Sequence, residues 1–376
     1  MFNFEHLSTL KNLINHNQLR MLFQTSTMFN NTLFFHKNIF IMEEIITKKE
    51  LNLAFAGVGW IGLNRLKSIT RNSNAKALLL YDPSSDALRK ASEVVPLAKT
   101  VDTFNEMLSH PDVDGAVIAT PNFLHYTQSI EALNNGIPVF CQKPLSKNSQ
   151  ETYEILDAAK KQNKSLVVDY TYRCTKAFRS LQNTIAQDEL GEIYSADLVF
   201  HNAYGPEKAW CYNFELSGGG CLLDLGVHLI DMALIILNFP EVKLLNSNLY
   251  SKGNKLKSRE QVVEDYAQAS LITENNCLIN IACSWNLNIG KGAEIKLLFN
   301  GTKGTAQLSN INGSFFDFRT ELFKGDKTYE LFSGNDDWGS RLALEWIDKI
   351  TQDNSFDEES LKYLNTAEVI DKIYER

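Results

Sequence analysis

The stretch LNLAFAGVGWIG, residues 51–62, determines the fold that the sequence predicts. Its apolar first half is typical of a buried strand, and its second half is a glycine-rich turn that opens a helical segment. In such a unit the glycines let the backbone approach a pyrophosphate, and the N-terminus of the helix supplies N–H groups and positive potential. The residues of this turn that we expect to hold a dinucleotide are Gly57, Gly59, Trp60, Ile61 and Gly62.

An acidic residue after the second strand-like run supports this prediction. Asp82 lies twenty residues beyond Gly62, at the end of the run Ala77 to Tyr81, where a carboxylate accepts hydrogen bonds from the hydroxyls of a ribose. The carboxylate would repel a 2′-phosphate, and Pro83-Ser84 offers no arginine to compensate, so we expect NAD to be preferred to NADP. The alternative, a glycine-rich turn with an unrelated surface aspartate, fits this placement less well.

Short β-rich runs alternate with helical stretches in the first part of the chain, as in the βαβ units of a parallel sheet. An amphipathic segment among them, Asn122 to Asn135, ends at Gly136, a residue that commonly stops helices. The pattern predicts an open, doubly wound sheet over residues 51–172. Its expected strands are Leu51 to Ala56, Ala77 to Tyr81, Gly115 to Ala119, Ile137 to Cys141 and Ser165 to Asp169.

A different pattern begins after residue 172. Strand-like runs follow one another without helices between several of them, and Asn300-Gly301 and Lys303-Gly304 are typical of hairpin turns. We therefore expect a second, α+β domain with antiparallel strands over residues 173–376. Its expected strands are Ile193 to His201, Ala267 to Leu271, Leu278 to Trp285 and Glu294 to Phe299, and its last helices are Asp337 to Thr351 and Ser360 to Tyr374.

The composition is that of a soluble globular protein. The chain has 376 residues, 44% of them hydrophobic, and no apolar run approaches the roughly 20 residues that cross a bilayer. A net charge of −8 without a basic, aromatic-rich stripe argues against nucleic acid as a partner. The six cysteines form no CxxC pair, which favours reduced cytoplasmic thiols over disulfides or zinc. We expect small buried side chains at Cys141, Cys174, Cys211, Cys221, Cys277 and Cys283.

Residues 1–50 differ from the rest of the chain. They are rich in Asn, Phe and Thr without an organised apolar period, so we expect an extension outside the fold. A secretory signal or a transit peptide fits poorly, because a compact apolar segment with a cleavage site is lacking and Arg20 is the single arginine. Two hypotheses remain, a native start at Met42 and a disordered tail. Intact mass of the native protein that includes residues 1–41 would contradict the first.

A lysine lies where open α/β sheets bind ligands. Gln142-Lys143-Pro144 follows the expected strand Ile137 to Cys141, at the edge formed by the carboxyl ends of the strands. A side chain there faces the crevice, although a lone lysine in a loop is more often only solvated.

A second candidate group lies in a glycine-rich entry to an apolar helix. Gly218-Gly219-Gly220 precedes Asp224 and His228, whose spacing of four places both side chains on one helical face, so that they can meet one ligand. Asp231 lies on the same face and is a candidate to orient the imidazole. A capping aspartate with a structural histidine is the alternative. A metal site is disfavoured because further ligands are lacking nearby.

The combined motifs resemble the Gfo/Idh/MocA family of oxidoreductases, from Leu51 to the end of the chain. The resemblance implies a Rossmann domain followed by a domain with a large, mostly antiparallel open sheet that forms homodimers or homotetramers. It maps the family's EKP lysine to Lys143, and the acid and histidine of its DxGxH motif to Asp224 and His228. Two further segments resemble the surroundings of the nicotinamide and of the substrate: Thr120-Pro121-Asn122 with His125, and Tyr172-Arg173.

The sequence departs from the family where Gln142 replaces the usual glutamate. A neutral amide can still bind a ribose hydroxyl, but it no longer offsets the charge of the adjacent Lys143. The residues before the glycines are candidates for the wall of a sugar pocket, with a role as ordinary core residues equally open. They are Trp210, Tyr212 and Asn213.

The resemblance implies hydride transfer between NAD and a secondary alcohol or hemiacetal carbon of a sugar, sugar derivative or cyclitol. His228 is then the expected general base, because an imidazole pKa near 6.5 suits proton removal at neutral pH. Lys143 would stabilise charge on the reacting oxygen, and Asp224 would orient a neighbouring hydroxyl. Two alternatives are redox-neutral, NAD-dependent cleavage of a glycosidic bond and a non-catalytic NAD-binding regulator. The presence of both Lys143 and His228 argues against the regulator.

Overall fold

The computed structural model describes residues 50–257 and 262–376. The expectations for residues 1–49, including a start at Met42, lie outside these described residues. Within them the strands form two sheets, one of six strands and one of nine.

The six-stranded sheet is parallel, with the order β3-β2-β1-β4-β5-β6. Successive strands are added in one direction from β1 to β3 and in the opposite direction from β4 to β6, so the strand order reverses between β1 and β4. Open sheets bind ligands in the crevice outside the carboxyl ends of the strands at such a point. The strands are β1 (Leu51–Ala56), β2 (Ala75–Tyr81), β3 (Lys99–Thr100), β4 (Gly115–Ile118), β5 (Val139–Cys141) and β6 (Leu166–Val168). The helices between them are α4 (Trp60–Asn72), α5 (Ser85–Val94), α6 (Phe104–Leu108), α7 (Asn122–Asn134) and α8 (Ser149–Lys161).

The predicted doubly wound sheet is confirmed. The predicted bounds of β1 agree with the structure, and those of the next four predicted strands differ by one or two residues at an end. The strand β3 was not predicted, because two exposed residues carry no periodic pattern.

The nine-stranded sheet has the order β15-β14-β13-β12-β7-β11-β10-β8-β9. Its neighbours pair antiparallel except for β7 and β11, which are parallel, so the predicted antiparallel character is confirmed. The strands are β7 (Ile193–Asn202), β8 (Val242–Ser251), β9 (Asn254–Lys255), β10 (Tyr266–Thr273), β11 (Leu278–Ser284), β12 (Ala293–Gly301), β13 (Thr305–Asn310), β14 (Phe318–Lys324) and β15 (Lys327–Gly334).

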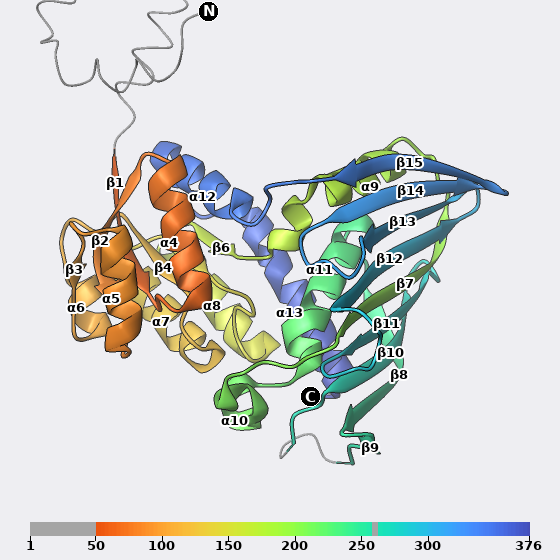
Figure 1. Cartoon of the computed structure of the whole chain (residues 1–376), viewed down its shortest axis with the longest axis horizontal. Helices are drawn as coiled ribbons and strands as arrows, with labels where there is room; N and C mark the ends of the chain where they lie inside the picture. Colours follow the sequence, from red (N-terminus) through yellow and green to blue (C-terminus); the bar gives the residue numbers. More distant parts are fainter. Residues whose placement is uncertain (1–49, 258–261) are drawn as a thin grey trace, which may run out of the picture. The chain divides into compact units, whose positions relative to one another are not determined.

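One face of this sheet is covered by the helices α9 (Lys176–Ala186), α11 (Val227–Ile236) and α13 (Lys362–Tyr374) (Figure 1). Along β12 the buried Ile295 and Leu297 alternate with the partly exposed Lys296 and Leu298, as the period of a strand requires. The other face of the sheet therefore carries the partly exposed side chains. The shorter helical segments of this part of the chain are η1 (Thr171–Cys174), η2 (Ala209–Tyr212), α10 (Phe214–Ser217), the π-helical η3 (Leu222–Gly226) and η4 (Glu358–Leu361).

The helix α12 (Arg341–Gln352) returns to the first sheet, although the sequence assigned it to the second domain. Trp346 and Ile350 lie in one apolar cluster with Leu53 of β1, and the ring centroids of Trp346 and Phe140 are 5.5 Å apart. The predicted helix Asp337 to Thr351 begins later, at Arg341. A residue from the far end of the chain thus helps to bury the strand that precedes the glycine-rich turn.

The stretch Phe214–Ile236 is long and apolar enough to cross a membrane by length and composition, contrary to the expectation that no apolar run approaches that length. However, 83% of its most apolar window is buried inside the structure, where it includes the core helix α11. Among the cysteines, all of which lie in the described residues, five are buried as predicted, and Cys211 is partly exposed instead because it lies in the short η2 segment.

Candidate active site

The glycine-rich turn has the shape that a dinucleotide requires. Gly57 has a φ of +80°, and a Cβ on Gly62 would lie 1.9 Å from the carbonyl oxygen of Gly57. A Cβ on Gly59, in contrast, meets no described atom within 4 Å, and the side chains around it do not cap the N-terminus of α4. Free N–H groups therefore face open space at Gly59, which fits the pyrophosphate of a dinucleotide. Trp60 beside it is largely exposed, and Ile61 is half-buried.

Asp82 lies at the carboxyl end of β2 and is tied to the same turn. Its Oδ2 accepts a hydrogen bond of 2.9 Å from the backbone N–H of Val58, and its Oδ1 accepts one of 2.8 Å from Ser84. The carboxylate is thus fixed beside the glycines, where a ribose would follow the pyrophosphate.

The segment after β4 connects the two halves of the site. Pro121 caps α7, the hydroxyl of Thr120 donates to Gln128, and Nδ2 of Asn122 donates to the carbonyl oxygen of Ser217 at 2.9 Å. The buried imidazole of His125 joins two loops, with Nδ1 2.7 Å from the carbonyl oxygen of Pro144 and Nε2 2.7 Å from that of Thr120.

The side chain of His125 therefore links the loop at Thr120 to the loop at Pro144. Each ring nitrogen lies at hydrogen-bond distance from a backbone carbonyl oxygen, and burial lowers the pKa of the imidazole, so that the neutral ring donates to one of the two. The ring is buried between the two loops, and a direct contact of His125 with a cofactor stays a prediction.

Gln142 is hydrogen-bonded to a buried carboxylate. Its Nε2 donates to Oδ2 of Asp169 at 2.6 Å, and its Oε1 accepts from the backbone N–H of Lys143 at 3.2 Å. Arg65 of α4 donates from Nε to the same oxygen of Asp169, also at 2.6 Å. Each end of the amide keeps one further hydrogen-bonding site, so the binding of a ribose hydroxyl by Gln142 stays a prediction.

Two of the predicted catalytic residues are in direct contact. Nζ of Lys143 lies 2.6 Å from Oδ1 of Asp224 and 2.7 Å from the carbonyl oxygen of the same residue. The lysine follows the first sheet and the aspartate lies in η3, so the contact joins the two domains. Their side chains are 18% and 40% exposed, which leaves both open to a ligand. Asp224 supplies the anion that the sequence lacks at position 142.

His228 lies one turn further on and is 5% exposed. Its ring packs edge-on against that of Tyr172, with the ring centroids 4.7 Å apart. The ring centroids of Tyr170 and Phe200 lie 6.2 and 6.5 Å from that of His228. Burial first, then the positive charges of Lys143 and Arg173, hold the pKa of His228 well below its usual 6.5. Its Nδ1 is buried without a hydrogen-bond partner in the described residues, and the imidazole is neutral at pH 7.

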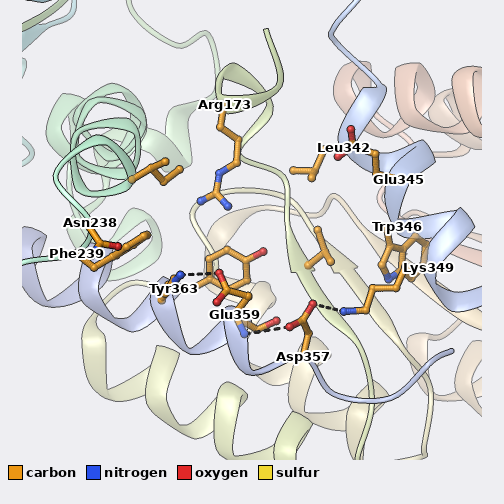
Figure 2. Close-up of a pocket in the computed structure, with 14 residues that line it drawn as sticks. Arg173, Asn238, Phe239, Leu342, Glu345, Trp346, Lys349, Asp357, Glu359 and Tyr363 are labelled. Carbon is orange, nitrogen blue, oxygen red and sulfur yellow. Dashed lines mark hydrogen bonds and ion pairs between the residues drawn. The ribbon is translucent and has the colours of Figure 1, made fainter. Parts of the chain in front are cut away.

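The expectation that Asp231 orients His228 is wrong. Both carboxylate oxygens of Asp231 bind the guanidinium of Arg173, one of them at 2.9 Å from Nε. The side chain of Arg173 lies over the rings of Tyr170 and Tyr363 and points into a cavity of about 430 Å³ (Figure 2). Among the described residues, those that line this cavity do not include Lys143, Asp224 or His228.

The glycines before η3 are explained by a buried carboxylate that the sequence did not reveal. Glu264 accepts hydrogen bonds from the backbone N–H groups of Gly220 and Leu222, at 2.9 and 3.0 Å, and from the hydroxyl of Tyr374 at 2.7 Å. A Cβ on Gly220 would lie 1.9 Å from the carbonyl oxygen of Glu264. Since η3 is a π-helical turn, the α-helical argument for one shared face of Asp224 and His228 does not apply as stated.

The three candidates for a pocket wall lie near this group in the chain but differ in their contacts. Trp210 packs edge-on against Phe123 at 6.3 Å, and Tyr212 packs against Trp285 at 5.7 Å. Asn213 is the N-cap of α10, where its side chain accepts from Leu216. Nε1 of Trp285 donates a hydrogen bond of 3.0 Å to Oδ2 of Asp224. Of the three candidates, Tyr212 is therefore the one that contacts a residue bonded to Asp224.

Two family models match the chain along most of the described length. Residues 51–170 match the oxidoreductase family with an NAD-binding Rossmann fold, and residues 178–307 match the GFO/IDH/MocA C-terminal domain. The chain belongs to the Gfo/Idh/MocA family. It is therefore an NAD(P)-dependent oxidoreductase, and the resemblance stated from its motifs is confirmed.

Proteins of this family that resemble the chain include enzymes of sugars. D-glucoside 3-dehydrogenase of Escherichia coli (strain K12) is 28% identical over 279 residues, which are 71% of this chain and 79% of that protein. Glucose-6-phosphate 3-dehydrogenase of Bacillus subtilis (strain 168) is 25% identical over 240 residues, 62% of this chain and 67% of that protein.

Two solved structures show the same fold. KijD10, a 3-ketoreductase from Actinomadura kijaniata in complex with NADP and TDP-benzene, matches with a TM-score of 0.74 at 17% identity, over 86% of this chain and 97% of that one. GenD2 from gentamicin A biosynthesis, in complex with NAD, matches with a TM-score of 0.73 at 18% identity, over 87% and 94%. Members of this fold thus bind either dinucleotide.

Proposed function

We propose that this family member oxidises a secondary alcohol or hemiacetal carbon of a sugar, sugar derivative or cyclitol, or reduces the corresponding carbonyl. The observation that carries the proposal is the contact of 2.6 Å between Lys143 and Asp224, with the buried His228 one turn away. The named relatives support a sugar as substrate, because they are dehydrogenases of a glucoside and of glucose 6-phosphate.

Each of the three residues has a separate task in this proposal. Lys143 carries a positive N–H donor at the crevice, where it binds the reacting oxygen and stabilises negative charge that develops there. Asp224 accepts a hydrogen bond from a neighbouring hydroxyl and so orients the substrate. His228 is neutral and removes the proton of the reacting hydroxyl, but its pKa lies well below the value near 6.5 that the sequence led us to expect, which makes it a weaker base than a free imidazole. The nicotinamide, when bound, supplies or accepts the hydride.

NAD is the proposed cofactor, with NADP the less favoured one. The backbone N–H groups of Val58 and Ser84 hold Asp82 beside the turn, and this supports a hydrogen bond to its carboxylate from the ribose 2′-hydroxyl of NAD and repulsion of the 2′-phosphate of NADP.

The experiment is a screen of purified protein with NAD and with NADP against sugars, their glycosides and cyclitols. Steady production of NADH in step with loss of an alcohol is expected. Release of an aglycone without net NADH would instead favour redox-neutral glycoside cleavage. Tight NAD binding with no turnover of any compound would favour a non-catalytic regulator.

A further inference from the structure

The indole of Trp285 holds the carboxylate of Asp224 on the side opposite to Lys143. Trp285 directly follows β11, its side chain is 4% exposed, and its Nε1 donates to Oδ2 of Asp224 at 3.0 Å. Lys143 binds the other oxygen, Oδ1, at 2.6 Å. Donors from two different domains therefore bind the two oxygens of one carboxylate.

These two hydrogen bonds fix the rotation of the carboxylate. The terminal torsion of an aspartate is broad, and Lys143 alone would leave the group free to swing about the bonded oxygen. An ionised carboxylate offers about four acceptor sites, and Lys143 and Trp285 occupy two of them. The side chain of Asp224 remains 40% exposed, so further acceptor sites of its carboxylate stay accessible to a ligand in the orientation that the two donors give it.

A second aromatic side chain packs against Trp285. The exposed ring of Tyr212 lies edge-on against the indole at 5.7 Å. A Cβ on Gly205 would lie 2.4 Å from the hydroxyl of Tyr212, so the backbone at Gly205 packs closely against that ring. The packing of Tyr212 thus helps to hold the indole beside Asp224.

We propose that Trp285 is a positioning residue that makes the enzyme select substrates with a hydroxyl on the carbon next to the reacting one. Asp224, oriented by the indole N–H, accepts the hydrogen bond of that neighbouring hydroxyl. The substrate class is thus a vicinal diol or α-hydroxy ketone on a sugar or cyclitol ring. This inference rests on the proposed function, since it concerns recognition by the same site.

Trp285→Phe tests the inference, because it removes the N–H and retains an aromatic ring. For a ring substrate that the wild type oxidises, we expect KM to rise about 10-fold, as for loss of a hydrogen bond to a charged group, with kcat changed less than about threefold. For the analogue that lacks the neighbouring hydroxyl, KM should be the same in wild type and variant. The dissociation constant for NAD should not change.

Trp346→Phe is the matched control. Trp346 is 1% exposed, and its Nε1 is buried without a hydrogen-bond partner within residues 50–257 and 262–376. This substitution therefore removes a buried indole without removing a hydrogen bond, and KM should stay at the wild-type value. If Trp285→Phe folds poorly, Trp285→His retains a ring N–H and should keep part of the preference for the hydroxylated substrate.

Two failures are distinguishable. A wild-type enzyme that is active, with the same preference for the neighbouring hydroxyl in Trp285→Phe, would overturn the role of Trp285 and leave the proposed function intact. A wild-type enzyme that binds NAD and turns over no sugar or cyclitol would overturn the proposed function and this inference with it.

Discussion

Nε2 of Gln142 donates a hydrogen bond of 2.6 Å to Oδ2 of Asp169, the oxygen that also accepts from Nε of Arg65. Asp169 is buried, and burial raises the pKa of its carboxyl group, against the opposing effects of Arg65 and Gln142. An amide donor at position 142 therefore suits a carboxylate at position 169. The glutamate that is usual in the family at position 142 would face a second acid here.

Restoring that glutamate should destabilise the protein. In Gln142→Glu two carboxyl groups meet at hydrogen-bond distance, and we expect the free energy of unfolding to fall by roughly 1–3 kcal/mol at pH 8. Repulsion raises the pKa of the pair in the folded state, so the folded protein binds a proton more readily as the pH falls, and the deficit should shrink toward pH 5. Denaturant unfolding of the wild type and of Gln142→Glu at pH 8 and at pH 5 measures this difference in the free energy of unfolding.

The double substitution Gln142→Glu with Asp169→Asn is the control for that experiment. It leaves one carboxyl group beside Arg65 and should recover part of the lost stability. A double variant less stable than Gln142→Glu alone would contradict the account of charge repulsion.

Two glycines of the turn should respond differently to alanine. Gly59→Ala adds a methyl group in open space, so we expect an unchanged melting temperature and a loss of NAD affinity of at least tenfold, because the methyl group lies where the pyrophosphate approaches. Gly62→Ala would place a Cβ 1.9 Å from the carbonyl oxygen of Gly57 and should lower the melting temperature. Equal NAD affinity of Gly59→Ala and wild type, by calorimetry, would show that the dinucleotide does not lie over this turn.

The part of the site that the sequence predicts is the part encoded by neighbouring residues. The turn from Gly57 to Gly62 follows β1 directly, and Lys143 follows β5, so strand periodicity and spacing are enough to place them. The family motifs assigned Lys143 and Asp224 to one site, and the structure adds that their side chains are in direct contact.

The supporting residues lie far from these motifs in the chain and carry no local signal. Asp169 is separated from Arg65 by 104 positions, and Trp285 from Asp224 by 61. Trp285 stands at the end of a predicted strand, where an apolar residue suggests only core packing. The strands β8 and β15 were missed because the burial of their residues does not follow a period of two. The strands β13 and β14 were also missed, although alternate residues along each of them are buried.

Asp82→Ala should narrow the preference for NAD over NADP, measured as the ratio of kcat/KM values. The substitution removes the charge that repels a 2′-phosphate. It also removes acceptors for the N–H groups of Val58 and Ser84, so the value for NAD should fall as well. Asp86→Ala is the control, because that exposed aspartate of α5 pairs with Arg89 and Lys90 only on the surface. A wild-type preference for NADP would contradict the prediction.

The nine-stranded sheet should be an association surface. Within the described residues, the face turned away from α9, α11 and α13 carries the partly exposed Leu298 of β12 among polar side chains, and the edge strand β15 carries the exposed Tyr329 and Leu331. We expect a homodimer or homotetramer by light scattering at micromolar concentration. A charged residue at Leu298, on the uncovered face, should shift the mass toward the monomer, and a monomeric wild type would exclude the prediction.

The titration of His228 should appear in the pH profile far below neutrality. Its pKa in the folded protein is held well below 6.5, so the neutral base persists, and the acid limb of kcat/KM should lie well below pH 6.5. Because the pKa of His228 is lower in the folded protein, the unfolded chain binds a proton at this residue at pH values where the folded protein does not. Stability should therefore fall as the pH drops below about 6.5, and His228→Ala should weaken this dependence.

Lys143→Ala and His228→Ala test the catalytic assignment itself. Groups that act only as the hydride moves should matter to turnover and little to cofactor affinity, so both variants should bind NAD almost as the wild type does. Removal of a general base typically lowers the rate by about 10² to 10⁴, and the His228 variant should also lose the acid limb.

Asp224→Asn should raise KM more than it lowers kcat, because that residue orients the substrate. His201→Ala, on the uncovered face of the sheet, is the matched control and should leave kcat unchanged. Near wild-type kcat in both Lys143→Ala and His228→Ala with a confirmed substrate would show that the chemistry takes place elsewhere in this fold.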